Sequence, residues 1–158
     1  MSQISNHTFD EISIGQTASY SRVIGEKEIV LFAAASGDVN PVHLDEAFAA
    51  GTMFKQRIAH GMLTGGVISA ALALVLPGPG VIYLGQSMRF RKPVTIGDEL
   101  TVHLEVTAKR DDRKFVTLDC TVVNQSGTIV ADGTAEVMAP TDKIVIDLPP
   151  EPQVSIEA

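Results

Sequence analysis

The chain has 158 residues, of which 45% are hydrophobic and 20% charged, a composition that favours one folded domain with a sizeable core over a disordered chain. Its formal net charge of -7 repels nucleic-acid phosphates, and no run of Lys and Arg offsets it, so we expect no nucleic-acid partner. The lone Cys120 excludes an internal disulfide, and the first residues lack the basic and apolar regions of a signal peptide, so we expect a cytoplasmic protein.

The first half of the chain predicts helices after an extended lead-in that runs to about Tyr20. Apolar residues at helical spacing and early acids predict a helix over residues 25–36, which Gly37 ends. A second, short helix is expected over residues 44–51. Residues 61–76 are apolar all round, which is typical of a helix that is buried on every side.

The long apolar stretch raises the question of a membrane span, because no Asp, Glu, Lys or Arg lies between Arg57 and Arg89. The sequence "PGPG" at residues 77–80 divides this stretch. A helix over the part before it measures about 24 Å at 1.5 Å per residue, short of the roughly 30 Å hydrocarbon core of a bilayer. We therefore expect a buried helix and no membrane span.

Four strands are expected in the second half, and their alternation predicts a sheet with one apolar face. Leu100, Val102 and Leu104 alternate with polar residues, and Cys120 falls on the apolar face of its strand, as a core residue would. The turn sequences "RDDRK" and "NQSG" join neighbouring strands, which makes them antiparallel. The strands are residues 81–91, 99–110, 114–123 and 128–138.

Three sequence motifs resemble those of the MaoC-like dehydratases, in particular the (R)-specific enoyl-CoA hydratase group. They are "SGDVNPVHLD" at residues 36–45, "AHGML" at 59–63 and "IYLGQSMRFRKPVTIGDEL" at 82–100, in the order that the family has. The resemblance covers about residues 9–138. It implies an α+β hot-dog fold, in which a curved antiparallel sheet wraps a long central helix. Residues 1–140 would form one MaoC-like hot-dog domain and the proline-rich residues 141–158 a tail or linker.

The resemblance also implies a reaction, the reversible hydration of a trans-2-enoyl-CoA to an (R)-3-hydroxyacyl-CoA. It implies a homodimer with the acyl pocket near the interface. The chain is similar as well to the MaoC-like domain of bifunctional enoyl-CoA hydratase/phosphate acetyltransferases, so it could be one domain of a longer protein.

Two residues of the first motif, Asp38 and His43, are the candidates for this chemistry. A turn explains Asn40 and Pro41, but it does not require an acid and an imidazole on either side of them. A carboxylate and an imidazole held close together can exchange protons near neutral pH, as hydration of an enoyl thioester needs. Asn40 could orient the Asp38 carboxylate or hold the loop, and we favour the loop.

Two further groups of residues are expected to contact the substrate. Gly61 opens the apolar helix, so its backbone N–H is a candidate donor to the thioester oxygen, with His60 as a neighbouring contact or a structural residue. Arg89, Arg91 and Lys92 could hold the phosphates of coenzyme A or could be solvated strand-face charges.

The sequence indicates no cofactor. No His, Cys or Asp cluster has metal-ligand spacing, and no phosphate-binding loop is present, so neither a metal nor a nicotinamide or flavin cofactor is expected. Two alternatives to the hydratase remain. The chain could be a hot-dog thioesterase in which Asp38 activates water toward the carbonyl, or a non-catalytic acyl-CoA-binding or dimerisation module, as the linker-like tail would allow.

Overall fold

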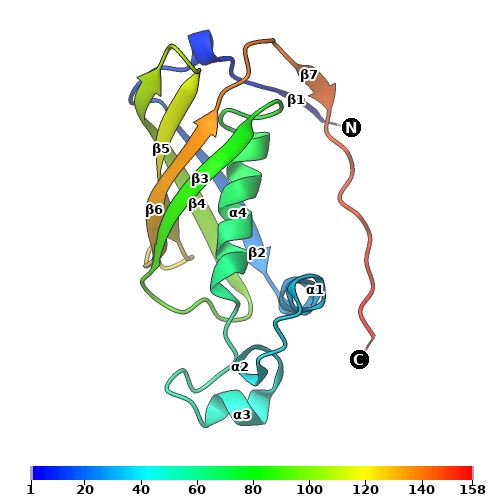
Figure 1. The fold of residues 1–158 in the computed structure, drawn as a ribbon. Helices are drawn as coiled ribbons and strands as arrows, with labels where there is room; N and C mark the ends of the chain where they lie inside the picture. The colour runs from blue at the N-terminus through cyan, green and yellow to red at the C-terminus, as the bar shows by residue number, and fades with distance from the viewer. Residues whose placement is uncertain (1, 158) are drawn as a thin grey trace.

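The main body of the protein is one curved, five-stranded antiparallel sheet with its strands in the order β2-β4-β5-β6-β3, seen in a computed structural model that describes residues 2–157 (Figure 1). A separate two-stranded sheet pairs β1 with β7. The β4, β5 and β6 strands form the expected meander, whereas β3 joins the far side of β6. The strands are β1 (Gln3–Ser5), β2 (Thr17–Ile24), β3 (Ile82–Phe90), β4 (Asp98–Arg110), β5 (Phe115–Val123), β6 (Ile129–Met138) and β7 (Val145–Asp147).

The helices lie along the sheet and below one end of it (Figure 1). The long helix α4 runs along the inner side of the curved sheet, and α1, α2 and α3 gather at the end where α4 begins. This is the predicted arrangement of a central helix and a wrapping sheet. The helices are η1, a single 3-10 turn (Phe9–Glu11), α1 (Glu26–Ser36), α2 (Pro41–Leu44), α3 (Glu46–Ala50) and α4 (Gly61–Leu74).

The strands bury the face that their alternation predicts. In β4, Leu100, Val102 and Leu104 are at most 1% exposed, whereas His103 between them is exposed. Cys120 of β5 is 1% exposed, and burial raises the pKa of its thiol to about 11. A thiol that stays protonated at neutral pH is a core residue and not a nucleophile, as the sequence predicts.

The helix α4 is buried on one side only, so the prediction of burial on every side is wrong for the single chain. Ile68, Ala71 and Leu72 face the sheet and are at most 1% exposed. On the opposite side Met62 is 62% exposed, and Gly66 is exposed as well. The physical reason is that a single curved sheet covers only about half of the circumference of a helix, which leaves an apolar strip uncovered.

The C-terminal segment, expected to be a loose tail because of its prolines and acids, is attached at two places. Its strand β7 pairs with β1, and the Asn6 amide donates to the carbonyl oxygens of Asp142 (2.9 Å) and Pro79 (3.0 Å). Further along, the Glu151 carboxylate binds the Arg22 guanidinium through two hydrogen bonds of 2.6 and 2.9 Å. Composition predicts neither contact, because both depend on partners far away in the sequence.

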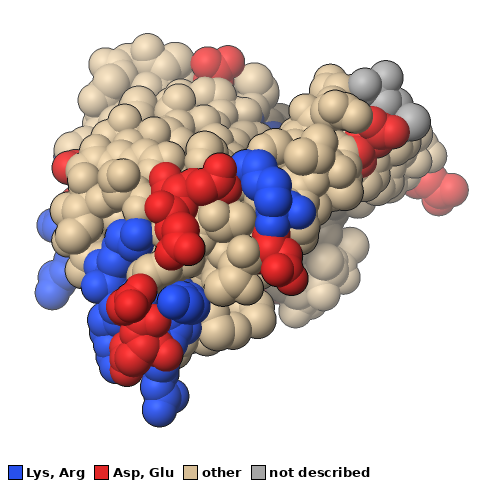
Figure 2. Space-filling model, turned by 90° about the horizontal axis from the view of Figure 1, so that it is seen from above, with Lys and Arg blue, Asp and Glu red and all other residues tan. Residues whose placement is uncertain are grey.

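Charged side chains of both signs lie next to one another at the end of the sheet opposite α2 and α3. Figure 2, which views residues 2–157 from that end, shows Lys and Arg beside Asp and Glu and no continuous basic stretch on this face. Arg110 pairs there with Asp112 at 3.4 Å and Lys114 with Asp111 at 3.5 Å, exposed ion pairs that contribute little to stability. No helix within residues 2–157 has the length and apolar character needed to cross a membrane.

We expect the variant Glu11→Gln to lose thermal stability at neutral pH. The Glu11 carboxylate accepts hydrogen bonds from the backbone N–H of Thr8 and from the Lys143 ammonium, which lower its pKa from 4.5 to about 2. Because the pKa of Glu11 is lowered in the folded state, its ionised carboxylate stabilises the fold at pH values above the pKa of the unfolded chain. This stabilisation disappears as the pH falls through the lowered pKa of the folded state. Thermal unfolding should therefore show a lower midpoint for the variant at pH 7 and no difference at about pH 2. A difference that persisted at the acid end would contradict this.

Candidate active site

The short loop between α1 and α2 carries Asp38, and α2 itself carries His43. Gly37 ends α1 in the left-handed conformation (φ +82°), and its N–H donates to the Ala33 carbonyl. The Asn40 side chain then caps α2 by accepting from the Val42 N–H at 3.2 Å. Asn40 therefore holds the loop, the role favoured from the sequence.

The side chains of Asp38 and His43 face each other, with 3.8 Å between the Asp38 Oδ2 and the His43 Nε2. The Asp38 carboxylate is half exposed, whereas the His43 side chain is 11% exposed. A distance of 3.8 Å is too long for a direct hydrogen bond, but one water oxygen can lie about 2.8 Å from both atoms. The loop therefore offers a site at which a single water molecule touches a carboxylate and an imidazole together.

The tautomer of His43 follows from its second nitrogen. Its Nδ1 lies 2.8 Å from the carbonyl oxygen of Ile58, which can only accept a hydrogen bond. In the neutral ring Nδ1 therefore carries the proton, and the Nε2 that faces Asp38 has a free lone pair. This nitrogen is ready to accept a proton from water.

His60 lies directly against this pair. Its Nε2 is 3.0 Å from the backbone oxygen of Asp38, and its ring stacks on that of His43 with centroids 3.8 Å apart and planes inclined by 28°. Asp38, His43 and His60 each place a possible metal-ligand atom within 4.8 Å of the others. His43 Nδ1 and His60 Nε2, however, each face a backbone carbonyl oxygen, so in the neutral rings these two nitrogens carry protons and offer no lone pair to an ion.

Gly61 is the first residue of α4, directly after His60. The first N–H groups of a helix have no acceptor within it, so the Gly61 N–H is available to a substrate oxygen. The ring of Phe90 packs so closely on Gly61 that a Cβ at this position would lie 2.8 Å from two ring atoms. A larger residue here would therefore have to push the Phe90 ring aside.

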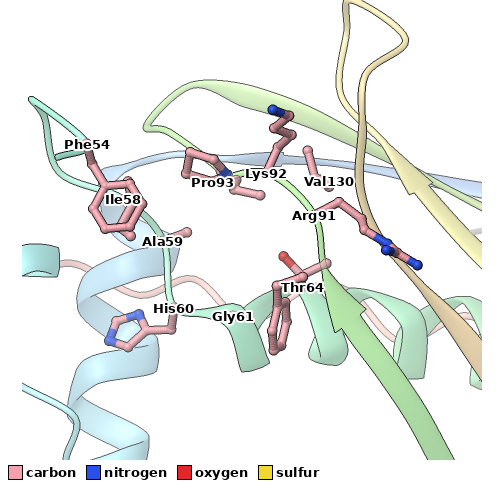
Figure 3. Close-up of a pocket in the computed structure, with 12 residues that line it drawn as sticks. Phe54, Ile58, Ala59, His60, Gly61, Thr64, Arg91, Lys92, Pro93 and Val130 are labelled. Carbon is pink, nitrogen blue, oxygen red and sulfur yellow. The ribbon is translucent and has the colours of Figure 1, made fainter.

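A cavity of about 400 Å³ opens beside Gly61 (Figure 3). It lies between the segment before α4 and the segment that follows β3, and Arg91 and Lys92 are on its wall with Thr64 and Val130. A second cavity of about 390 Å³, largely apolar, lies between α1, β2 and α4, where it meets Phe32 and Gly66.

The three basic residues expected to act together are placed differently. Arg91 and Lys92 line the cavity beside Gly61, whereas Arg89 is not part of its wall. The Arg91 guanidinium is also bound to Asp132 at 3.1 Å, so its charge is partly neutralised. Lys92 and Arg91 are thus the pair that the fold brings to this cavity.

Sequence reasoning missed the residues that support the loop from behind. The Arg57 side chain, 11% exposed, donates from Nε to the His43 carbonyl at 2.6 Å and binds Glu26 at 2.8 Å. The carbonyl of Ile58 orients His43, and Phe90 covers Gly61. The only available indication was an arginine placed just before the "AHGML" motif, since backbone carbonyls leave no pattern in a sequence.

Comparison with known proteins agrees with this fold. The model of the MaoC like domain matches residues 10–127. A curated (R)-specific enoyl-CoA hydratase from Rhodospirillum rubrum is 49% identical over 85% of this chain and 92% of its own length, and one from Aeromonas caviae is 46% identical over 82% and 96%.

Solved structures support the same assignment. The unliganded R-hydratase PhaJ1 from Pseudomonas aeruginosa superposes with a TM-score of 0.94 at 53% identity, covering 99% of this chain and 100% of that one. The (R)-hydratase from A. caviae superposes with a TM-score of 0.79 over 82% of this chain and 98% of that one. These similarities confirm the hot-dog fold expected from the motifs. With the matched domain covering most of its length, this chain belongs to the MaoC-like domain family.

Proposed function

We propose that this protein is an (R)-specific enoyl-CoA hydratase, which adds water reversibly to a trans-2-enoyl-CoA. The names of its relatives support the reaction. The observation that carries the proposal is the free lone pair of His43 Nε2, held 3.8 Å from the Asp38 carboxylate beside the start of α4. Acid, base and oxyanion donor are the three groups that the reaction needs.

In the proposed mechanism, the Asp38 and His43 pair handles both proton transfers. One member takes a proton from the bound water as the water oxygen forms a bond to the β-carbon. The pair then gives this same proton to the α-carbon, which returns Asp38 and His43 to their starting state, so the net reaction adds one water across the double bond. The Gly61 N–H would donate to the thioester oxygen, on which negative charge develops before the α-carbon is protonated.

The basic residues beside the cavity are proposed to hold the coenzyme A moiety. Lys92 and Arg91 stand on the cavity wall next to Gly61, so phosphates bound there would leave the thioester near the oxyanion donor. Arg89 is exposed on β3, outside the wall, and would reach only the outer part of the ligand. The cytoplasmic location stays a prediction from the sequence.

The assay with crotonyl-CoA tests the proposed reaction against the two alternatives. A hydratase lowers the absorbance of the conjugated thioester and yields 3-hydroxybutyryl-CoA of the R configuration. A thioesterase releases a free thiol, and a binding module changes neither. Loss of enoyl absorbance without free thiol is the expected result, and thiol release or an inert protein would overturn the proposal.

We also propose that two copies form a dimer through β3 and the uncovered strip of α4. The edge strand β3 exposes both of its faces, with Ile82 50%, its neighbour Tyr83 37% and Leu84 45% exposed, and the apolar Met62 of α4 is exposed as well. An exposed apolar edge strand is normally covered in a stable protein, and a second copy covers it by a two-fold axis.

The variant Leu84→Asp should therefore sediment as a monomer at micromolar concentration, whereas the wild type sediments as a dimer. A charge on the contact surface must be desolvated when the two copies associate. Val145→Asp on β7, where the residue is 55% exposed, is the matched control and should remain dimeric. A wild-type protein that is monomeric and fully active would contradict the dimer.

A further inference from the structure

The imidazole of His60 is enclosed by the groups that it contacts. The residue is 3% exposed, and its ring stacks on His43 at 3.8 Å and meets the Phe32 ring at 4.8 Å, tilted by 50°. In Figure 3 the ring points away from Thr64 and Lys92, on the other side of its own backbone. A substrate in the cavity beside Gly61 therefore meets the backbone of His60 and not its ring, which argues against the substrate contact expected from the sequence.

The hydrogen bonds of His60 fix its protonation. Nε2 lies 3.0 Å from the Asp38 carbonyl oxygen, an acceptor only, so Nε2 carries the proton. Nδ1 is then an acceptor, and it is buried with no hydrogen-bond partner among the described residues. In the neutral ring the single proton is therefore the one that the Asp38 carbonyl accepts. A buried acceptor without a partner is unfavourable and calls for a reason to keep histidine here.

We infer that His60 is a positioning residue that joins the Asp38 and His43 pair to the oxyanion donor. This rests on the proposed hydratase function. Its N–H holds the backbone of Asp38, its ring face holds the plane of His43, and its own carbonyl carbon is bonded to the Gly61 nitrogen. One residue therefore links three groups, which come from the α1–α2 loop, α2 and α4: the first two through its side chain and the third through its peptide bond.

The need for two contacts at once explains the choice of histidine. A phenylalanine would keep the stack on His43 but would offer no donor to the Asp38 carbonyl. A glutamine would keep a donor but would lose the flat ring. Only an imidazole offers both from one short side chain, and the unpaired Nδ1 is the consequence. The two substitutions therefore separate the two contacts.

The test compares kcat and KM of His60→Phe and His60→Gln with crotonyl-CoA. Because misplacement of a catalytic group lowers the rate without weakening substrate binding, each variant should lose about 10-fold to 10²-fold in kcat, with KM within about twofold of wild type. In an Asp38→Asn background, His60→Phe should lower kcat further by less than about threefold, because groups that act as a unit are not additive. His103→Gln, on the exposed face of β4, is the control and should match wild type.

Three kinetic results would overturn the inference. A raised KM with unchanged kcat would make His60 a substrate contact. If His60→Phe lowered kcat in the Asp38→Asn background by as much as it does in the wild type, His60 would act independently of Asp38. Wild-type kinetics in both His60 variants would show that His60 has no role in the reaction. Failure of the hydratase proposal is separate, since it would already show as an inactive wild type.

A second measurement needs no activity and no substitution. The nitrogen NMR spectrum of the wild-type imidazoles should show the neutral His60 ring with its proton on Nε2 and not on Nδ1, because Nε2 faces the Asp38 carbonyl oxygen. A neutral His60 ring with its proton on Nδ1 would contradict the positioning role, whatever the enzyme does.

Discussion

Asp38→Asn and His43→Gln are each expected to lower kcat for crotonyl-CoA hydration by about 10² to 10⁴, the usual contribution of a general acid or base. Both substitutions keep the size of the side chain and remove its proton chemistry. Asparagine at position 38 can still accept the Asn40 N–H, so the loop should keep its shape. The double variant should lose much less than the product of the two single losses, because the two groups act as a unit.

Two measurements serve as controls for this experiment: thermal unfolding of the variants and the rate of a matched histidine variant. The unfolding free energy of Asp38→Asn, at a half-exposed site, should change by about 1 kcal/mol or less. His103→Gln changes a histidine on the outer face of the sheet and should leave the rate unchanged. A well-folded Asp38→Asn protein with wild-type kcat would show that the pair is a structural turn.

Gly61→Pro is expected to lower kcat by about 10² to 10³ relative to Gly61→Ala, the usual loss for one oxyanion donor. Proline is accepted at the first position of a helix, where its missing N–H breaks no helical bond. The preceding residue, His60, already has the extended conformation that proline requires (φ -61°, ψ 138°). The substitution thus removes the proposed donor with little change in the backbone.

Gly61→Ala is the matched control, because it brings the same Cβ against Phe90 and keeps the N–H. The shift of the Phe90 ring that a Cβ demands is therefore common to both variants, and the ratio of their kcat values reports mainly the loss of the N–H. Equal kcat values for the alanine and proline variants would show that Gly61 is needed only for space.

Much of the site could be predicted because its residues are close in the sequence. Asp38 and His43 lie on either side of an Asn-Pro turn. Gly61 is the first residue of a helix that the apolar composition of residues 61–76 predicts. Local rules of capping and helix ends are enough to place these groups. The expectation that Asn40 holds the loop follows from the same rules and agrees with its hydrogen bond to Val42.

The rest depends on contacts between distant segments. The stack of His60 on His43 joins α2 to the residue before α4, and the Arg57 contact with the His43 carbonyl involves a backbone atom that has no sequence signature. Periodicity likewise shows that α4 is apolar but not how much of it one sheet can cover. The position of β3 beside β6 was open for the same reason, since strand order is set by packing and not by alternation.

A crystal structure of the Asp38→Asn variant with crotonyl-CoA tests the account most directly, because the slowed reaction should leave the enoyl thioester intact. The account predicts the thioester oxygen about 3 Å from the Gly61 nitrogen. It also predicts the β-carbon facing His43 Nε2, with the phosphates toward Lys92. An acyl group bound instead in the cavity between α1, β2 and α4, with Gly61 and His43 untouched, would contradict it.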